Sequence, residues 1–289
     1  MLYVIGLIAV AVMLVLQFLT KKTASSFVTR LISGVILVLL ALMIIISGGL
    51  ILFFAALILS VIGLSELYSA FGIRTEAKPN RLELFGYLGV IVYYVCILFL
   101  PQNVGWLGIL AALILVLGLY VFTFPAYGIE QIRGVVFGIL YVGVMLSCVY
   151  LLRSMNSGQY LVWLIFLSAW GSDTCAYCSG MLLGKHKMTP VLSPKKTIEG
   201  AIGGVAGAVI LGLLFALITT KQYVPYMLIC LAGAFIAMIG DLAASAIKRQ
   251  TGIKDYGTLI PGHGGVLDRF DSVIFTAPAV YLMSLLLIG

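Results

Sequence analysis

The chain has 289 residues, of which 63% are hydrophobic and 9% are charged, and its mean hydropathy is +1.20. This composition excludes a soluble domain and is typical of a polytopic helical membrane protein, whereas a transmembrane barrel would show short alternating segments. The net charge of +7 raises the question of nucleic-acid binding, but the positions of the bases along the chain give a different explanation.

Apolar windows of about 17–23 residues recur along the whole chain, and each is long enough to cross a bilayer as a helix. They predict an all-α fold, a polytopic integral membrane helical bundle of about nine or ten spans. The windows cover residues 2–20, 31–47, 50–67, 84–100, 104–124, 134–152, 160–183, 198–218, 224–247 and 272–288. Ser47-Gly48-Gly49 leaves almost no loop between two windows, which predicts a tight hairpin or one long bent helix.

The bases indicate the orientation of the spans. Residues 2–20 lack a preceding basic region, which favours a retained anchor with its N-terminus outside over a cleaved signal peptide. When the spans alternate from that start, every Lys and Arg except Arg153 and Lys221 falls on the inner side. This bias predicts that the loops 184–197 and 248–271 are cytoplasmic. Topology and an anionic substrate then account for the positive charge, so we expect no nucleic-acid partner.

Charged and polar residues concentrate toward the C-terminus. We expect residues 1–158 to form N-terminal transmembrane helices, about six spans, and residues 159–289 to form a catalytic transmembrane module with both basic loops. The stretch 241–271 mixes acids, bases, glycines and one histidine. Such a mixture suits a polyphosphate held by a divalent metal, because carboxylates supply hard oxygen ligands and bases offset the remaining phosphate charge.

Two acids lie inside apolar windows. Asp173 is about ten residues from the inner end of its window, hence ~15 Å deep, and Asp241 is about six residues from its own, hence ~9 Å. A carboxylate at mid-membrane costs ~3 kcal/mol or more, so each is expected to face a wet cavity, a metal or a partner. The alternatives are a structural hydrogen bond from Asp173 to Trp170, Ser172 or a neighbouring helix, and a simple Asp241–Lys248 pair.

Two more acids, Asp268 and Asp271, lie at the start of the last span. We interpret Asp268 as a metal ligand and Asp271 as a ligand or a neighbour of one, although carboxylates here also cap a helix N-terminus. Arg269 is expected to reach phosphate or to pair with an acid. His263 donates to a phosphate, orients a ligand or shapes the turn. Without further His or Cys ligands nearby, zinc is not expected.

A short basic segment leads into the window at 198–218. It reads Ser193-Pro194-Lys195-Lys196-Thr197. Two ammonium groups beside a helix N-terminus form an anion site, so we expect this segment to bind substrate. The alternative is that both lysines are ordinary bases of an inner loop. Glu66 is interpreted as interfacial or structural.

Three stretches of the chain resemble the phosphatidate cytidylyltransferases, also called CDP-diacylglycerol synthases. They are Trp170-Gly171-Ser172-Asp173, Ser193-Pro194-Lys195-Lys196-Thr197-x-Glu199-Gly200, and Ser245-x-Ile247-Lys248-Arg249-x4-Lys254-Asp255-x-Gly257-x2-Ile260-Pro261-x-His263-Gly264-Gly265-Val266-x-Asp268-Arg269-Phe270-Asp271. The last departs from the signature of this family at no fixed position. The N-terminal half is similar only in general hydrophobic character.

The resemblance implies an enzyme of phospholipid biosynthesis that joins CTP and phosphatidate at the cytoplasmic face of the cell (inner) membrane. We expect Mg²⁺ on Asp241 and Asp268, with Asp271 and Asp173 as further candidate ligands and room for a second cation. Catalysis is assigned to Asp241, Asp268, Lys248 and Arg269. Substrate binding is assigned to Ser193, Lys195, Lys196, Arg249, Lys254 and His263. Whether two copies form a homodimer is left open.

Two other classes of protein also fit part of the sequence. A transporter or channel would also bury Asp173 and Asp241, but it gives no reason for the dense charged loop at 248–271. Another CTP-dependent lipid transferase or kinase shares the chemistry. A CDP-alcohol phosphotransferase would carry a DG-x2-AR-type acidic cluster, which the sequence lacks, and a polyprenol kinase differs only in its acceptor lipid.

Overall fold

The computed structural model describes residues 38–289 except 75–78, 102 and 261–263. Within these residues, seven helices are long and apolar enough to cross a membrane. They confirm the all-α fold of a polytopic membrane protein. The seven are α3 (Gly49–Ala70), α4 (Arg81–Phe99), α6–η1–α7 (Ile129–Arg153), α8–η2–α9 (Gly158–Leu183), α10 (Ile198–Ile218), α11 (Tyr223–Thr251) and α12 (Leu267–Leu287).

Every apolar window from residue 50 onward coincides with a helix, including the shorter α5 (Leu107–Thr123). The window 2–20 lies outside the described residues, and the second window is described only as the helix Val38–Ser47. Gly48 and Gly49 both adopt positive φ, 58° and 50°. Because a helix cannot continue through such a backbone, this is a joint between two helices and not one long bent helix.

Two of the spans contain a π-helical segment. η1 (Ile139–Val144) separates α6 (Ile129–Gly138) from α7 (Met145–Arg153), and η2 (Leu167–Gly171) separates α8 (Gly158–Phe166) from α9 (Ser172–Leu183). A π turn holds one residue more than an α turn, so it rotates every following side chain around the helix axis. η2 ends directly before α9, and it therefore sets the face on which Asp173 lies.

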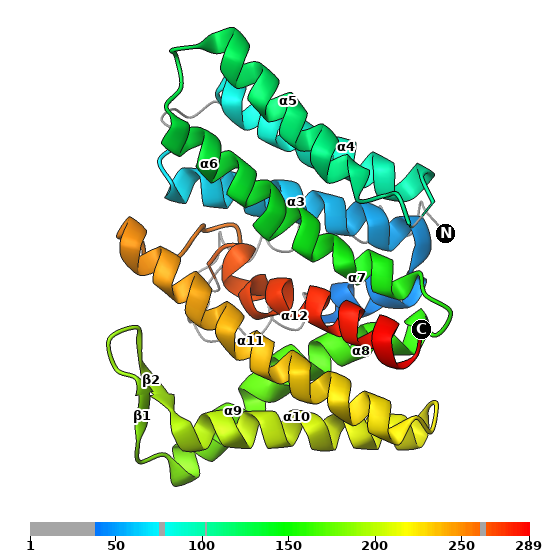
Figure 1. Ribbon diagram of the computed structural model, residues 1–289. Coiled ribbons are helices and arrows are strands. Elements are labelled where there is room, and N and C mark those ends of the chain that lie inside the picture. The colour runs from blue at the N-terminus through cyan, green and yellow to red at the C-terminus, as the bar shows by residue number, and fades with distance from the viewer. Residues whose placement is uncertain (1–37, 75–78, 102, 261–263) are drawn as a thin grey trace, which may run out of the picture.

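The helices are arranged as neighbouring pairs (Figure 1). α4 packs against α5 on one side of the molecule, and α9, α10 and α11 form the opposite side. α12 lies between them and packs against both α7 and α11. The contact between α12 and α7 joins the two expected parts of the chain, residues 1–158 and 159–289. The division of the chain into these two parts stays a prediction.

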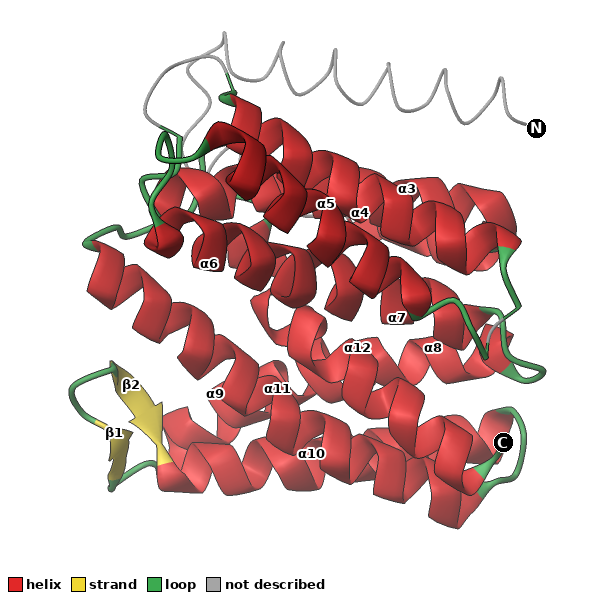
Figure 2. Ribbon diagram, turned by 45° about the horizontal axis from the view of Figure 1, so that its top comes forward, coloured by secondary structure: helices red, strands yellow, loops and turns green. Residues whose placement is uncertain are grey.

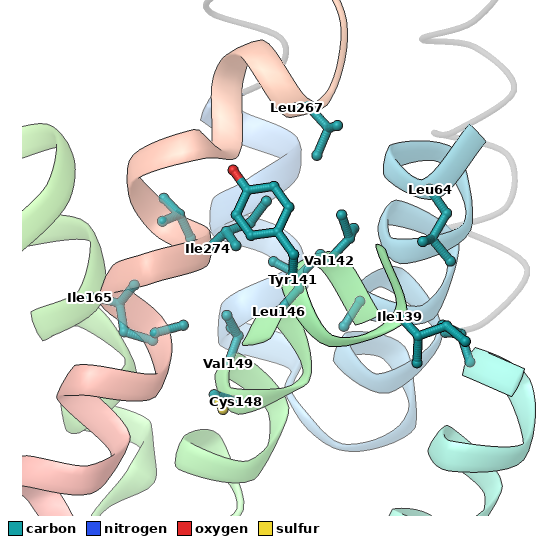
Figure 3. Close-up of a cluster of buried hydrophobic side chains, with 14 of the residues drawn as sticks. Leu64, Ile139, Tyr141, Val142, Leu146, Cys148, Val149, Ile165, Leu267 and Ile274 are labelled. Carbon is teal, nitrogen blue, oxygen red and sulfur yellow. The ribbon is translucent and has the colours of Figure 1, made fainter. Parts of the chain in front are cut away.

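The core lies where α3, η1 and α12 meet (Figure 3). Leu64 of α3, Val142 of η1, and Leu267 and Ile274 of α12 are almost fully buried there, beside Tyr141. By contrast, large apolar side chains remain exposed along the outer faces of α5 and α10. Apolar outer faces of this kind suit contact with lipid chains.

α10 packs on α9 through glycines. A Cβ atom at Gly204 would lie 2.9 Å from the carbonyl oxygen of Ser172, and one at Gly200 would lie 2.9 Å from that of Ala176. Small residues let two membrane helices approach until their backbones touch. The close packing expected from the small residues of this span is therefore present.

Two short strands extend the bundle at one end (Figure 2). β1 (Lys187–Thr189) and β2 (Ser193–Thr197) form an antiparallel hairpin that joins α9 to α10. The hairpin, the C-terminus of α11 and the C-terminus of α3 lie at the same end of the bundle (Figure 1). The α7–α8 and α10–α11 connections, which carry Arg153 and Lys221, lie at the other end.

The two basic loops are therefore expected on the same side of the membrane. In a variant without native cysteines, a single cysteine at Val191, which is 95% exposed on the hairpin, and one at Lys254 should react with an impermeant thiol reagent from the same side. A cysteine at Lys221 is the matched control and should react only from the opposite side. Labelling of Val191→Cys and Lys254→Cys from different sides would contradict this arrangement.

Candidate active site

α11 extends beyond its predicted apolar window and ends at Thr251. Its last turn carries Lys248 and Arg249, and bases there are favoured by the partial negative charge of a helix C-terminus. Gly252, with φ 72°, then terminates the helix, and the amide of Ile253 donates to the carbonyl of Lys248 at 3.0 Å.

The carboxylate of Asp241 lies about ten residues from the end of α11, which is ~15 Å at the helical rise. The last turn of α11 is polar and lies beyond the apolar window, so the expected depth of Asp241, ~9 Å from the end of that window, stays a prediction. Asp173 lies at the same separation from the end of α9. α9 and α11 are in contact, and the charges of the two carboxylates act on each other.

Lysines from different elements neutralise two of the candidate acids. Lys196 of β2 forms an ion pair with Asp241 of α11. Lys248 of α11 donates to Asp268 Oδ1 of α12 at 3.0 Å. The sequence placed Asp241 and Lys248 on one face of a helix and left a pair between them as an alternative. In the structure, each instead forms an ion pair with a residue of another element.

Asp268 organises the loop between α11 and α12. Its side chain is 3% exposed, and its second oxygen, Oδ2, accepts from the amides of Tyr256 at 2.8 Å and Gly265 at 3.0 Å. Each hydrogen bond to a charged group contributes about 1.5–3 kcal/mol. The carboxylate therefore fixes the loop while its other oxygen faces the ammonium of Lys248.

Tyr256 is a member of this site that the sequence did not single out. Its side chain is buried, and its hydroxyl donates to the carbonyl of Ala244 at 3.1 Å. Burial raises the pKa of this phenol well above its ordinary value, so it remains a neutral donor. The ammonium of Lys248 lies 5.4 Å from the centre of its ring. The feature of the sequence that could have identified Tyr256 is an aromatic residue inside a glycine-rich charged loop.

Asp173, Lys195 and Lys196 line one cavity of about 360 Å³ between α9, α10 and the hairpin. Its other walls are apolar and include Met181 and Met238. The volume falls within the range of about 300–1,000 Å³ typical of ligand pockets. Both lysines of the predicted anion segment and Asp173 of the stretch Trp170-Gly171-Ser172-Asp173 thus line the same cavity.

Asp271 lies within the field of neighbouring charges. Those of Asp241, Asp173 and Lys248 all act on its carboxylate, and its Oδ1 accepts from the amide of Ser272 at 2.7 Å. The four candidate acids are therefore gathered on α9, α11 and α12.

The remaining predicted residues lie on the periphery. Arg249, Lys254 and Arg269 are exposed, which leaves them accessible to an anion from solution. Ser193 lies in β2 opposite Thr189. Thr197 caps α10 by accepting from the amide of Gly200 at 3.1 Å. His263 lies outside the described residues.

A second hollow, of about 660 Å³, lies beside the ends of α3, α6 and α11. It is lined mostly by Phe71, Ile73, Phe137 and neighbouring residues, with Arg133 and Glu130 paired at its rim. None of the predicted catalytic or substrate-binding residues lines it, so the smaller cavity is the candidate active site.

Comparison with known proteins agrees with this chemistry. The sequence model of the cytidylyltransferase family matches residues 28–287. The chain belongs to the cytidylyltransferase family. A phosphatidate cytidylyltransferase of Staphylococcus epidermidis is 34% identical over 268 residues, which are 90% of this chain and 98% of that protein. A phosphatidate cytidylyltransferase of Staphylococcus saprophyticus is 33% identical over 240 residues, which are 80% of this chain and 87% of that protein. One of Staphylococcus aureus is 34% identical over 268 residues, which are 90% of this chain and 98% of that protein.

For a cytidylyltransferase, the cavity geometry predicts that the lysines of β2 act on the nucleotide. Replacing Lys195 or Lys196 by Gln should lower turnover by up to ~10²-fold, because an amide cannot neutralise phosphate charge in the transition state. Steady-state kinetics with varied CTP measures this, and the melting temperature checks the fold.

The matched control is Lys187→Gln, since Lys187 is an exposed lysine of the same hairpin. It should leave turnover and CTP dependence unchanged. Unchanged kinetics in both Lys195→Gln and Lys196→Gln would remove the hairpin from the active site.

Proposed function

We propose that this protein is a phosphatidate cytidylyltransferase, which converts CTP and phosphatidate to CDP-diacylglycerol and pyrophosphate. The observation that carries the proposal is the meeting of acids from α9, α11 and α12 with lysines from β2 and α11 at one end of an apolar bundle. The names of the staphylococcal relatives support it. An apolar bundle suits a lipid acceptor, and a basic end suits a nucleoside triphosphate.

The reaction needs positioning and charge neutralisation more than a protein nucleophile. A phosphate oxygen of phosphatidate forms a bond to the α-phosphorus of CTP, while the bond from that phosphorus to the bridging oxygen breaks. Pyrophosphate leaves with the electron pair. Because the attacking phosphate is already anionic, the protein contributes alignment and electrostatic stabilisation.

The bases divide by position. Lys195 and Lys196 line the cavity, whereas Arg249, Lys254 and Arg269 are exposed at its end of the bundle. We assign both groups to the triphosphate and the lipid phosphate, with Arg side chains offering a planar fork and Lys side chains a point charge. The positive charge of the chain then serves these two anions and membrane topology, and not a nucleic acid.

The donor set fits Mg²⁺. Within the described residues, no three His, Cys, Asp or Glu side chains are arranged to hold a metal ion by themselves. In nucleotide enzymes Mg²⁺ is usually held by one or two carboxylates together with substrate phosphates and water. Asp241 and Asp268 each direct one oxygen at a cationic ammonium, so each already offers a hard oxygen to positive charge.

We therefore assign Mg²⁺ to Asp241 and Asp268, with Asp173 and Asp271, whose charges act on or are acted on by that of Asp241, as candidates to assist or to hold a second cation. When bound, Mg²⁺ would polarise the phosphates and offset their charge. Lys196 and Lys248 would then be released from these acids toward the substrate phosphates.

The proposed location is the bacterial cell membrane, with the active site on the cytoplasmic side. Seven apolar helices in the described part of the chain suit a multi-pass protein. The end that carries the site also carries the described bases other than Arg153 and Lys221, as the positive-inside rule requires of a cytoplasmic end. A cytosolic nucleotide and a lipid headgroup would meet there.

The decisive experiment supplies purified protein with CTP, Mg²⁺ and phosphatidate, and analyses the lipid product. We expect CDP-diacylglycerol and stoichiometric pyrophosphate. A parallel reaction with a polyprenol in place of phosphatidate should yield no product. Phosphorylated polyprenol would instead establish a CTP-dependent kinase, and the absence of any nucleotide turnover would favour a transporter.

Removing either proposed ligand charge should impair catalysis strongly. Asp241→Asn and Asp268→Asn keep the side-chain shape but lose the charge, and each should lower turnover ~10²-fold or more. Turnover is measured across a Mg²⁺ titration. Asp255→Asn serves as the control, because Asp255 is an exposed acid of the loop between α11 and α12. A variant at position 241 or 268 with wild-type turnover at limiting Mg²⁺ would show that its residue is not a ligand.

A further inference from the structure

Glu66 of α3 contacts the loop that carries the proposed catalytic acid, although the two are far apart in the sequence. The amide of Val266 donates to Glu66 Oε1 at 2.9 Å, and the amide of Leu267 donates to Oε2 at 2.8 Å. Glu66 is only 8% exposed. Both oxygens of a buried carboxylate are thus used at the first turn of α12.

These bonds replace a cap that α12 lacks. The first amides of a helix have no partner within the helix and are usually capped by the preceding side chain. Here the preceding residue is Val266, which offers no side-chain cap. The amide of Gly265 goes to Asp268, and the next two go to Glu66. A row of three amides is therefore shared by two carboxylates, one from α12 and one from α3.

The loop is also packed directly on the Glu66 carboxylate. A Cβ atom at Gly257 would lie 2.6 Å from Glu66 Oε1, and one at Gly265 would lie 2.5 Å from it. One turn earlier on α3, a Cβ at Gly63 would lie 3.1 Å from Leu267. α3 thus contacts the loop at Gly257 and Gly265 and the start of α12 at Leu267, which leaves no room for the loop to shift while Glu66 is in place.

We propose that Glu66 is a positioning residue for the transferase reaction, which holds the first turn of α12 and thereby keeps Asp268 aligned with Lys248. This inference rests on the proposed function of Asp268. The N-terminal part of the chain, which carries none of the predicted site residues, would then take a direct part in ordering the active site. Because a misplacement of about 1 Å costs about 10²-fold in rate, loss of this anchor should reduce the rate of chemistry more than substrate affinity.

The test is Glu66→Gln, compared with Glu83→Gln. Gln keeps the shape of Glu66 but can accept from only one amide, since its NH₂ group would face the other amide hydrogen. Glu83 is a fully buried acid of the N-terminal part that instead accepts from Arg74 at 2.9 Å and from Tyr87 at 3.1 Å. Both variants should lower the melting temperature, so stability alone does not separate them.

Two measurements separate them. Hydrogen exchange of the peptide that covers residues 256–268 should accelerate in Glu66→Gln and stay at the wild-type rate in Glu83→Gln. Under the same conditions, Glu66→Gln should lower kcat about 10- to 100-fold with KM for CTP within about twofold, whereas Glu83→Gln should keep kcat. Wild-type exchange in Glu66→Gln, or an equal loss of kcat in both variants, would overturn the inference.

A second route leaves Glu66 intact and covers the case in which Glu66→Gln does not fold. Gly257→Ala places a methyl group against the carboxylate and should reproduce both the faster exchange and the lower kcat. Gly128→Ala is its control, because a Cβ there meets nothing within 4 Å. Wild-type exchange and kcat in Gly257→Ala would count against the anchor. The exchange readout needs no turnover, so it tests the anchor even if the substrate assignment fails.

Discussion

The backbone amides at the start of α12 belong to buried residues, and the active site depends on which acceptors satisfy them. Asp268 accepts from Tyr256 and Gly265, and Glu66 accepts from Val266 and Leu267. An unpaired amide near a membrane interior costs several kcal/mol, so such a loop can persist only when internal acceptors are supplied. Two carboxylates meet this need, and one of them retains an oxygen for a cation.

The same constraint explains why the acids and bases come from different elements. A lone charge inside an apolar bundle is costly, and the cost falls when a counter-charge lies close. Asp241 meets Lys196 from the hairpin, and Asp268 meets Lys248 from the neighbouring helix. These pairs join β2, α11 and α12. Phosphates and a metal ion would exchange partners with them without leaving any charge uncompensated.

The position of the site at the end of the bundle follows from its two substrates. A lipid acceptor is confined to the membrane with its headgroup at the surface, and CTP arrives from solution. The cavity beside Asp173 has apolar walls and a polar lining of Lys195 and Lys196. The π-helical segment η2 directly precedes α9 and therefore sets the helix face on which this acid lies. A π-helical segment therefore lies directly beside the candidate active site, and π segments are frequent at functional sites.

The sequence by itself determined the helical membrane fold and the family, because the length of an apolar window and a dense local signature are both properties of neighbouring residues. It also named the acids and lysines that the structure gathers, although their roles stay predictions and His263 lies outside the described residues. It did not predict that α11 continues through its terminal bases to Thr251. Only the tertiary structure decided which charges pair and that Glu66 anchors α12, because such contacts join residues 200 positions apart through helix packing.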